Sequence, residues 1–315
     1  MHPKCGPKTS SCLMAIALCL LFSSPAESQL VKGGYLYTLS SFTGAIPYNW
    51  SRVAADKERN EIYVLYQNIL RIFNDSGMEI YQFGGDLDLG QIVDVSVDEG
   101  GDILLLVYKD SQIGIIRCNY RGEPKSRVEL RNLPRDFSDF SPNRMVYRNG
   151  NFYLASLIGF KIVIADRDGN FKKGYDVLSL LEIPDMDRSS AEMSGFSVDG
   201  EGNILLTVPT LFRAYVLSPN GKMNYFGRPG GAPGRFNIVA GIVRDSRGNF
   251  VVVDKLKSAV MIFDKNFNFV TQFGSYGKKG GNLVVPDDIA IDSRDRIYVT
   301  QMGRMGVSVF RLTYN

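Results

Sequence analysis

Histidine, cysteine and tryptophan are scarce in this chain of 315 residues, which has one, four and one of them respectively. The histidine, His2, and three of the cysteines precede residue 27. The rest of the chain therefore has no Ser-His-Asp or Cys-His nucleophile and no histidine-ligated zinc, which excludes most hydrolase mechanisms. The single tryptophan, Trp50, provides little aromatic platform for a polysaccharide.

The first 26 residues have the layout of a secretory signal peptide. Lys4 and Lys8 precede an apolar run over residues 12–22, and small residues follow at Ser24 and Ala26. A run of this length is too short to span a bilayer. We predict cleavage after Ala26 and export to a periplasm or to the outside of the cell, with no membrane span in residues 27–315.

An excess of charge of one sign is also lacking after that cleavage. The sequence has 36 basic and 33 acidic residues, and cleavage removes two lysines and no acid, so the net charge becomes +1. A nearly neutral protein has no general attraction to nucleic acid. Cys118 is the one remaining cysteine, so no internal disulfide is expected. We expect a monomer without a metal or a cofactor.

A β-hairpin pattern recurs six times along the chain. In its clearest copy, PDDIAIDSRDRIYVT at 286–300, an apolar run ends at Asp292, a polar turn follows, and a second apolar run begins. The residues that end the first run in each copy, here called anchors, are Asp56, Asp98, Arg148, Asp199, Asp245 and Asp292. An anchor carboxylate can accept hydrogen bonds from the turn backbone. The anchors lie 42, 50, 51, 46 and 47 residues apart, a period that suits one four-stranded propeller blade per repeat.

The repeats predict an all-β fold, a single six-bladed β-propeller over residues 27–315. The sixth repeat lacks its fourth strand, and residues 34–42 have the alternating aromatics of a fourth strand, so we predict that they complete the last blade and close the ring. The predicted blades lie near residues 50–84, 92–131, 142–178, 193–227, 239–274 and 286–312.

The best repeats resemble a known family. The pattern P-x-x-I-A-I-D-x-x-x-x-I-Y-V-T at 286–300, and its fifth-blade version with Asp245, Gly248 and Asn249, are similar to NHL repeats. The resemblance implies a six-bladed propeller that acts as a rigid binding platform. The resemblance also extends to propellers with lyase activity, which needs histidines, and to lactonase-type relatives that hold calcium with Glu, Asn and Asp. Asn143 and Asp287 are candidates for such a calcium site, but no matching Glu begins a first strand.

Charged residues are expected where the innermost strands enter the central channel. The positions four residues before the anchors are Arg52, Asp94, Arg144, Gly195, Gly241 and Asp288. In a closed ring, Asp288, Arg52, Asp94 and Arg144 follow one another on adjacent blades with alternating sign. One interpretation is an ion-pair network that plugs the axis. The other is that Arg52 and Arg144 bind a small anion beside a gap left by the two glycines.

The loops between blades differ in charge around the ring. Acidic residues lie in those joining blades one to four, at Asp86, Asp88, Asp136, Asp139, Asp185 and Asp187. Basic residues lie in the loops joining blades four to six, at Arg228, Arg235, Lys278 and Lys279. Together with the loop aromatics Phe137, Phe140, Phe236 and Tyr276, they form the candidate partner face. Such a face is either a solvated rim or a footprint for a partner. We predict an exported scaffold that binds a protein through these loops. The alternative is a channel-site enzyme, a calcium-dependent lactonase or a lyase, acting on a small anion.

Overall fold

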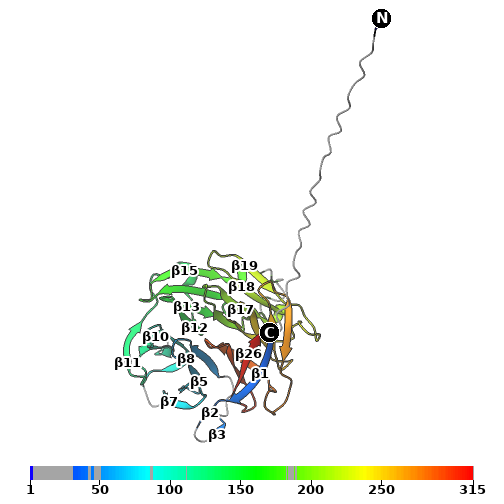
Figure 1. Ribbon diagram of the computed structural model, residues 1–315. Helices are drawn as coiled ribbons and strands as arrows, with labels where there is room; N and C mark the ends of the chain where they lie inside the picture. The colour runs from blue at the N-terminus through cyan, green and yellow to red at the C-terminus, as the bar shows by residue number, and fades with distance from the viewer. Residues whose placement is uncertain are drawn as a thin grey trace.

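The predicted all-β, six-bladed β-propeller is confirmed. A computed structural model describes residues 1–2, 31–41, 44–45, 51–85, 88–110, 112–181, 183, 188 and 190–314. Six four-stranded antiparallel sheets surround one axis, and the chain passes from blade to blade around it (Figure 1). The short helical elements are α1 (Val177–Leu180), η1 (Arg135–Phe137) and η2 (Pro209–Leu211). Residues 3–26 of the predicted signal peptide lie outside the described residues.

Each of the first three blades is a meander of four consecutive strands. The first blade consists of β4 (Arg52–Asp56), β5 (Glu61–Tyr66), β6 (Ile69–Phe73) and β7 (Glu79–Phe83). The second consists of β8 (Gln91–Val97), β9 (Ile103–Lys109), β10 (Gln112–Cys118) and β11 (Pro124–Val128). The third consists of β12 (Arg144–Arg148), β13 (Asn151–Ser156), β14 (Lys161–Asp166) and β15 (Phe171–Asp176).

The remaining blades follow the same order from the axis outward. The fourth consists of β16 (Phe196–Val198), β17 (Ile204–Val208), β18 (Arg213–Leu217) and β19 (Met223–Phe226). The fifth consists of β20 (Val239–Arg244), β21 (Phe250–Asp254), β22 (Ala259–Phe263) and β23 (Phe269–Phe273). The sixth consists of β24 (Pro286–Ile291), β25 (Arg296–Gln301), β26 (Val307–Tyr314) and β1 (Val31–Thr38).

The N-terminal strand closes the ring, as predicted, but its bounds differ from the expected 34–42. β1 pairs antiparallel with β26, from Val31 opposite Tyr314 to Thr38 opposite Ser308 (Figure 1). The pairing begins three residues earlier because β26 continues to Tyr314, which lets Val31 bury its side chain. Beyond the strand, β2 (Ser40–Ser41) and β3 (Gly44–Ala45) form a separate small hairpin.

The core lies between neighbouring blades. In the second strands, β9, β17 and β21 each contain at least five consecutive buried residues, because both faces of a middle strand pack against other strands. One cluster joins blades five and six through Val251, Val253, Ile291 and Val299. Each fully buried aliphatic side chain of this kind contributes about 1.5–3 kcal/mol, so the inter-blade contacts hold the ring closed.

The anchor aspartates bind the turns that follow them. Asp292 Oδ1 accepts hydrogen bonds from the backbone N–H groups of Arg294 and Arg296, both at 2.9 Å. Asp56, Asp199 and Asp245 accept from their own turns in the same way, and Asp98 accepts from Asp102 N at 2.9 Å. The third blade has Arg148 at this position and a two-residue turn, Asn149-Gly150, with φ of 50° and 71°. A two-residue turn of that geometry closes a hairpin without a carboxylate.

Candidate functional site: a channel with two different ends

The two ends of the channel are built from different connections. The inter-blade loops and the turns between second and third strands lie together at one end, here called the loop end. There Lys255 N donates to Ile238 O at 2.8 Å, and Lys257 Nζ donates to Ala232 O at 2.7 Å. The turns between first and second strands, which carry the anchors, surround the other end, here called the turn end. Each end presents its own set of side chains.

The four charged residues predicted for the channel lie close together, but their pairing differs from the predicted order. Arg144, 5% exposed, donates from Nη2 to both carboxylate oxygens of Asp288, at 3.0 and 3.2 Å. These residues belong to blades three and six, which face each other across the axis. Arg144 Nε also lies 3.5 Å from Asp94 Oδ2 on the adjacent blade. Arg144 therefore bridges three blades across the channel.

The environment of the four charges is that of a buried ion-pair network. Burial lowers the pKa of Arg144, but the Asp288 and Asp94 carboxylates raise it more, so that it lies above its ordinary value. Burial raises the pKa of Asp288, but Arg144 and Arg52 lower it more, and the net shift is downward. For Asp94, burial dominates and the pKa is raised. Both carboxylates are held by the backbone as well, Asp288 by Val53 N and Asp94 by Met145 N.

Arg52 is the member of this set that forms no ion pair within the part of the chain that is described. Repulsion from Arg144 lowers its pKa first, followed by burial, while Asp288 and Asp94 act in the opposite direction. The two arginines therefore do not form a joint anion site at this level of the channel, because Arg144 is already held by two carboxylates.

The gap predicted beside Gly195 and Gly241 is filled by the adjacent blades. A Cβ atom on Gly195 would lie 2.3 Å from the carbonyl oxygen of Ala240, on blade five. A Cβ atom on Gly241 would lie 2.9 Å from the backbone of Asp287 and Ile289, on blade six. The glycines thus allow neighbouring innermost strands to approach closely, and they leave no space for a ligand.

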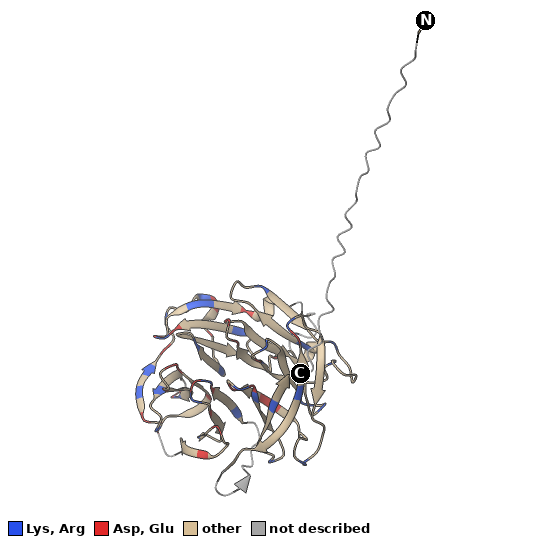
Figure 2. Cartoon of the chain, viewed as in Figure 1, with Lys and Arg blue, Asp and Glu red and all other residues tan. Residues whose placement is uncertain are grey.

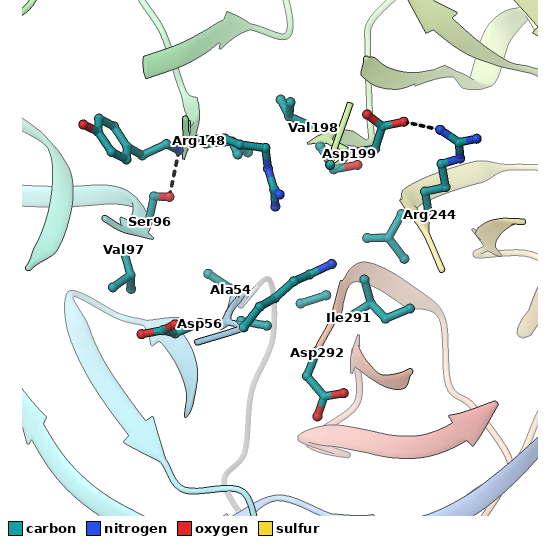
Figure 3. A pocket seen from close by; sticks show the side chains of 18 of the residues that line it. Ala54, Asp56, Ser96, Val97, Arg148, Val198, Asp199, Arg244, Ile291 and Asp292 are labelled. Atoms are coloured by element: carbon teal, nitrogen blue, oxygen red, sulfur yellow. Dashed lines mark hydrogen bonds and ion pairs between the residues drawn. The ribbon is translucent and has the colours of Figure 1, made fainter. Parts of the chain in front are cut away.

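A cavity of about 650 Å³ opens at the turn end, beyond the charged network. Its walls come from all six innermost strands and their turns, with apolar contributions from Ala54, Val198 and Ile291. Figure 3 shows that the carboxylates of Asp56 and Asp292 point away from the cavity, toward their own turns. None of the five aspartate anchors therefore offers a free carboxylate to the cavity.

Arg144, Arg244 and Arg247 line this cavity, and so do two further basic residues, Arg148 and Lys57, which are not among the site residues predicted from the sequence. Arg148, the one anchor that is not an aspartate, extends its side chain into the cavity (Figure 3). Lys57, which follows the anchor of blade one, also lines the cavity. The departure of Arg148 from the repeat pattern is the sequence signal that indicates its position, since a side chain not used by the turn is available to the channel.

Two aromatic residues of the predicted partner face, Phe137 and Phe236, are buried, and a third, Phe140, is partly buried. Phe236 is fully buried and packs against Phe226 and Phe263. Phe137 is buried, with its ring 6.4 Å from that of Phe140, which is itself partly buried against the core. The loops are long enough for these rings to fold back onto the sheets, where burial stabilises them. Tyr276, by contrast, is 75% exposed.

The charge difference between the two halves of the loop end is smaller than the sequence indicates, because lysines compensate two of the acids on the acidic half. On the acidic side, Asp88 pairs with Lys109 at 2.8 Å and Asp139 with Lys161 at 2.5 Å. On the basic side, the exposed side chains without an ion pair to any described residue are Arg228, Arg235, Lys278 and Lys279. Asp86, Asp185 and Asp187 lie outside the described residues. Elsewhere, basic and acidic residues are spread around the whole ring (Figure 2).

Exposed apolar side chains also gather at the loop end. Leu256, in the turn between β21 and β22, is 66% exposed, and Ile238, whose carbonyl group bonds to the same turn, is 41% exposed. Tyr276 lies in the next inter-blade loop. These residues, together with Arg228, Arg235, Lys278 and Lys279, are here called the basic sector. Ile158, 76% exposed, lies at the same end on blade three.

The two residues considered for a calcium site, Asn143 and Asp287, make other contacts in the structure. Asn143 Oδ1 accepts from Leu157 N at 3.0 Å, and Asp287 pairs with Lys255 at 2.7 Å. No group of three or more His, Cys, Asp or Glu side chains with metal-binding geometry occurs among the described residues. In that same part, no helix has the length and apolar character needed to cross a membrane.

Comparison with known proteins supports the fold alone. No protein-family model and no curated protein sequence matches the chain. A protein of unknown function from Bacteroides thetaiotaomicron is similar in structure, with a TM-score of 0.64 and 12% identity over 90% of this chain and 76% of that one. Virginiamycin B lyase from Staphylococcus aureus has a TM-score of 0.51 and 14% identity over 90% and 88% of the two chains. A gluconolactonase from Xanthomonas campestris has a TM-score of 0.57 and 10% identity over 92% and 99%.

Proposed function

We propose that this propeller binds a protein partner outside the cytoplasm and that the basic sector of its loop end is the contact surface. The observation that supports the proposal is the combination of four exposed cations, which form no ion pair with a described residue, with exposed Leu256, Tyr276 and Ile238. Arginine and aromatic side chains are typical anchors of protein interfaces. The complementary partner has an acidic surface with an apolar centre.

The rigidity of the loop end favours binding. The loops of the basic sector are fixed by backbone hydrogen bonds, such as Phe236 N to Arg228 O at 2.8 Å and Leu283 N to Ser275 O at 2.9 Å. The buried ring of Phe236 secures the first of these loops to the sheet. A surface held in place in this way loses little conformational entropy when a partner binds.

The alternative is a channel-site enzyme of the lactonase or lyase type. Two similar structures carry those names, which supports it at the level of the fold. Against it stands the channel itself, where Arg144 neutralises the two axial carboxylates that a metal or a general base would need. The lyase reading also requires histidine, and the only one in the chain is His2. The binding role is therefore the better supported of the two.

We also propose that the repeats are of the NHL type and that the chain is exported. The first rests on the pattern around Asp245 and Asp292 and on the carboxylate-bound turns that it forms. The second rests on the basic and apolar character of residues 1–26.

Charge reversal of the basic sector tests the proposed function. Purified native protein and the triple variant Arg235→Glu/Lys278→Glu/Lys279→Glu would be immobilised and exposed to the exported fraction of the source cells. We expect a protein that the native chain retains and the variant loses. Lys125→Glu/Arg127→Glu, on the outer strand β11, is the matched control and should retain it. Equal capture by the native protein and the triple variant would refute the assignment. Binding of the native protein to anionic vesicles, with no protein retained, would show that the partner is a membrane surface and not a protein.

A further inference from the structure

Blade three is the one blade whose anchor position places a cation, Arg148, at the turn-end cavity. In five blades the anchor carboxylate closes the turn, but in blade three the two-residue turn is closed by the backbone, with Tyr147 opposite Phe152 and Arg148 opposite Asn151. The side chain of Arg148 is therefore not required by its own hairpin. It extends into the cavity instead (Figure 3).

Arg148 has no hydrogen-bond or ion-pair partner within the described residues. Its Nε atom is buried and without an acceptor. Burial lowers its pKa, and interactions with Asp199, Tyr153 and Glu99 only partly offset this effect. A buried or half-buried cation without an acceptor costs free energy, which a bound anion would recover.

Lys57 strengthens the same field from blade one. No ion pair to Lys57 occurs in the part of the chain described. Its side chain is exposed, and its pKa is lowered first by desolvation and then by the charge of Arg148. The two cations therefore act on the same space from two sides of the cavity. Electrostatic repulsion between them favours a negative charge placed between them.

The acids that line the cavity are occupied by other groups. Asp199 accepts from Arg244 Nη1 at 2.8 Å, and Asp295 accepts from the backbone and hydroxyl groups of Ser246. Asp245 is held by Asn249 and by the hydroxyl group of Tyr314 at 2.9 Å. These carboxylates do not neutralise Arg148 or Lys57, although their charges limit how much negative charge the cavity can accept.

We infer that the turn-end cavity binds a small organic monocarboxylate, with Arg148 and Lys57 holding the carboxylate. Its two oxygens match the fork of a guanidinium group. A single negative charge is favoured because Glu58, Glu99 and Glu201 at the mouth repel a dianion such as phosphate more strongly. The volume of about 650 Å³ and the apolar walls at Ala54, Val198 and Ile291 suit a ligand with a carbon body. This site is at the opposite end from the basic sector and does not depend on the proposed function.

Calorimetric titration with sodium gluconate and sodium benzoate tests the inference, with glucose and benzyl alcohol as uncharged controls. At least one acid is expected to bind, and its matching neutral compound is not. Arg148→Gln and Lys57→Gln should each weaken binding at least about tenfold, since each removes a charge-assisted hydrogen bond. Arg311→Gln, an exposed arginine on β26, should leave binding unchanged.

Three outcomes would overturn the inference. The first is no binding of either acid to the native protein, and the second is equal affinity in the Arg148→Gln variant. The third is tighter binding of inorganic phosphate than of both acids, which would assign a different ligand class. Thermal unfolding provides an independent readout, because the loss of an unpartnered cation should not lower the melting temperature of Arg148→Gln. A fall of several degrees would mean that Arg148 has a structural role.

Discussion

Replacement of Asp288 by asparagine should destabilise the protein, because it breaks a buried ion pair across the channel. The change keeps the shape of the side chain and leaves Arg144, 5% exposed, with only Asp94 at 3.5 Å. Breaking a buried ion pair on one side costs about 3–5 kcal/mol, and we expect about 3 kcal/mol because Asp94 remains. At about 2–4 °C per kcal/mol for a large domain, the melting temperature should fall by about 6–12 °C.

A double-mutant cycle with Arg52 shows whether the loss comes from the charge balance. The native set has two arginines and two aspartates, and Asp288→Asn leaves one excess cation. In an Arg52→Gln background the remaining pair, Arg144 and Asp94, is neutral, so the loss should be smaller by at least about 1 kcal/mol. Calorimetric melting of the four proteins measures both effects. A change below about 0.5 kcal/mol for Asp288→Asn, or the same loss in both backgrounds, would refute the network.

Three further predictions concern pH, packing and thiol reactivity. The charges of Arg144 and Arg52 hold the pKa of Asp288 below its ordinary value, so the stabilisation that the carboxylate provides is present above about pH 4 and is lost as the pH falls through its pKa in the folded protein. The difference in melting temperature between the native and Asp288→Asn proteins should therefore shrink toward pH 3. A constant difference would contradict this. Gly195→Ala places Cβ 2.3 Å from the Ala240 carbonyl group and should cost about 1–3 kcal/mol, whereas Gly200→Ala, with no atom within 4 Å, should be silent in the same melting assay. Burial raises the pKa of Cys118 to about 11, so a disulfide reagent at pH 8 should modify it only after unfolding, and rapid modification of the native protein would contradict its burial.

The sequence predicts the propeller well because its main signal is local. Each anchor and its turn lie within a few residues of each other, and the same hydrogen bonds recur at Asp199, Asp245 and Asp292. The ends of β1 are different, since they depend on how far β26 continues on the other side of the ring closure. The repeat pattern contains no information on that distance, which explains the shift from 34–42 to Val31–Thr38.

The site could be predicted only in part. The position of Arg144 at the start of an innermost strand follows from the repeat, but its reach across the axis to Asp288 depends on the width of the channel, which is set by the close approach at Gly195 and Gly241. The burial of Phe236 depends on how its loop folds back onto the sheet. Arg148 was visible as the exception among the anchors, yet its orientation follows from the two-residue turn in three dimensions.

The most direct test of the proposed role is the affinity of the partner for the basic sector. Once a retained protein has been identified, its dissociation constant for purified native propeller would be measured by surface plasmon resonance at two salt concentrations. We expect binding that weakens with salt and weakens at least about a hundredfold in Arg235→Glu/Lys278→Glu/Lys279→Glu, because three attractive charges become repulsive. The Lys125→Glu/Arg127→Glu control should bind as the native protein does. Equal affinity of native and triple-variant proteins would contradict the central claim that this sector is the contact surface.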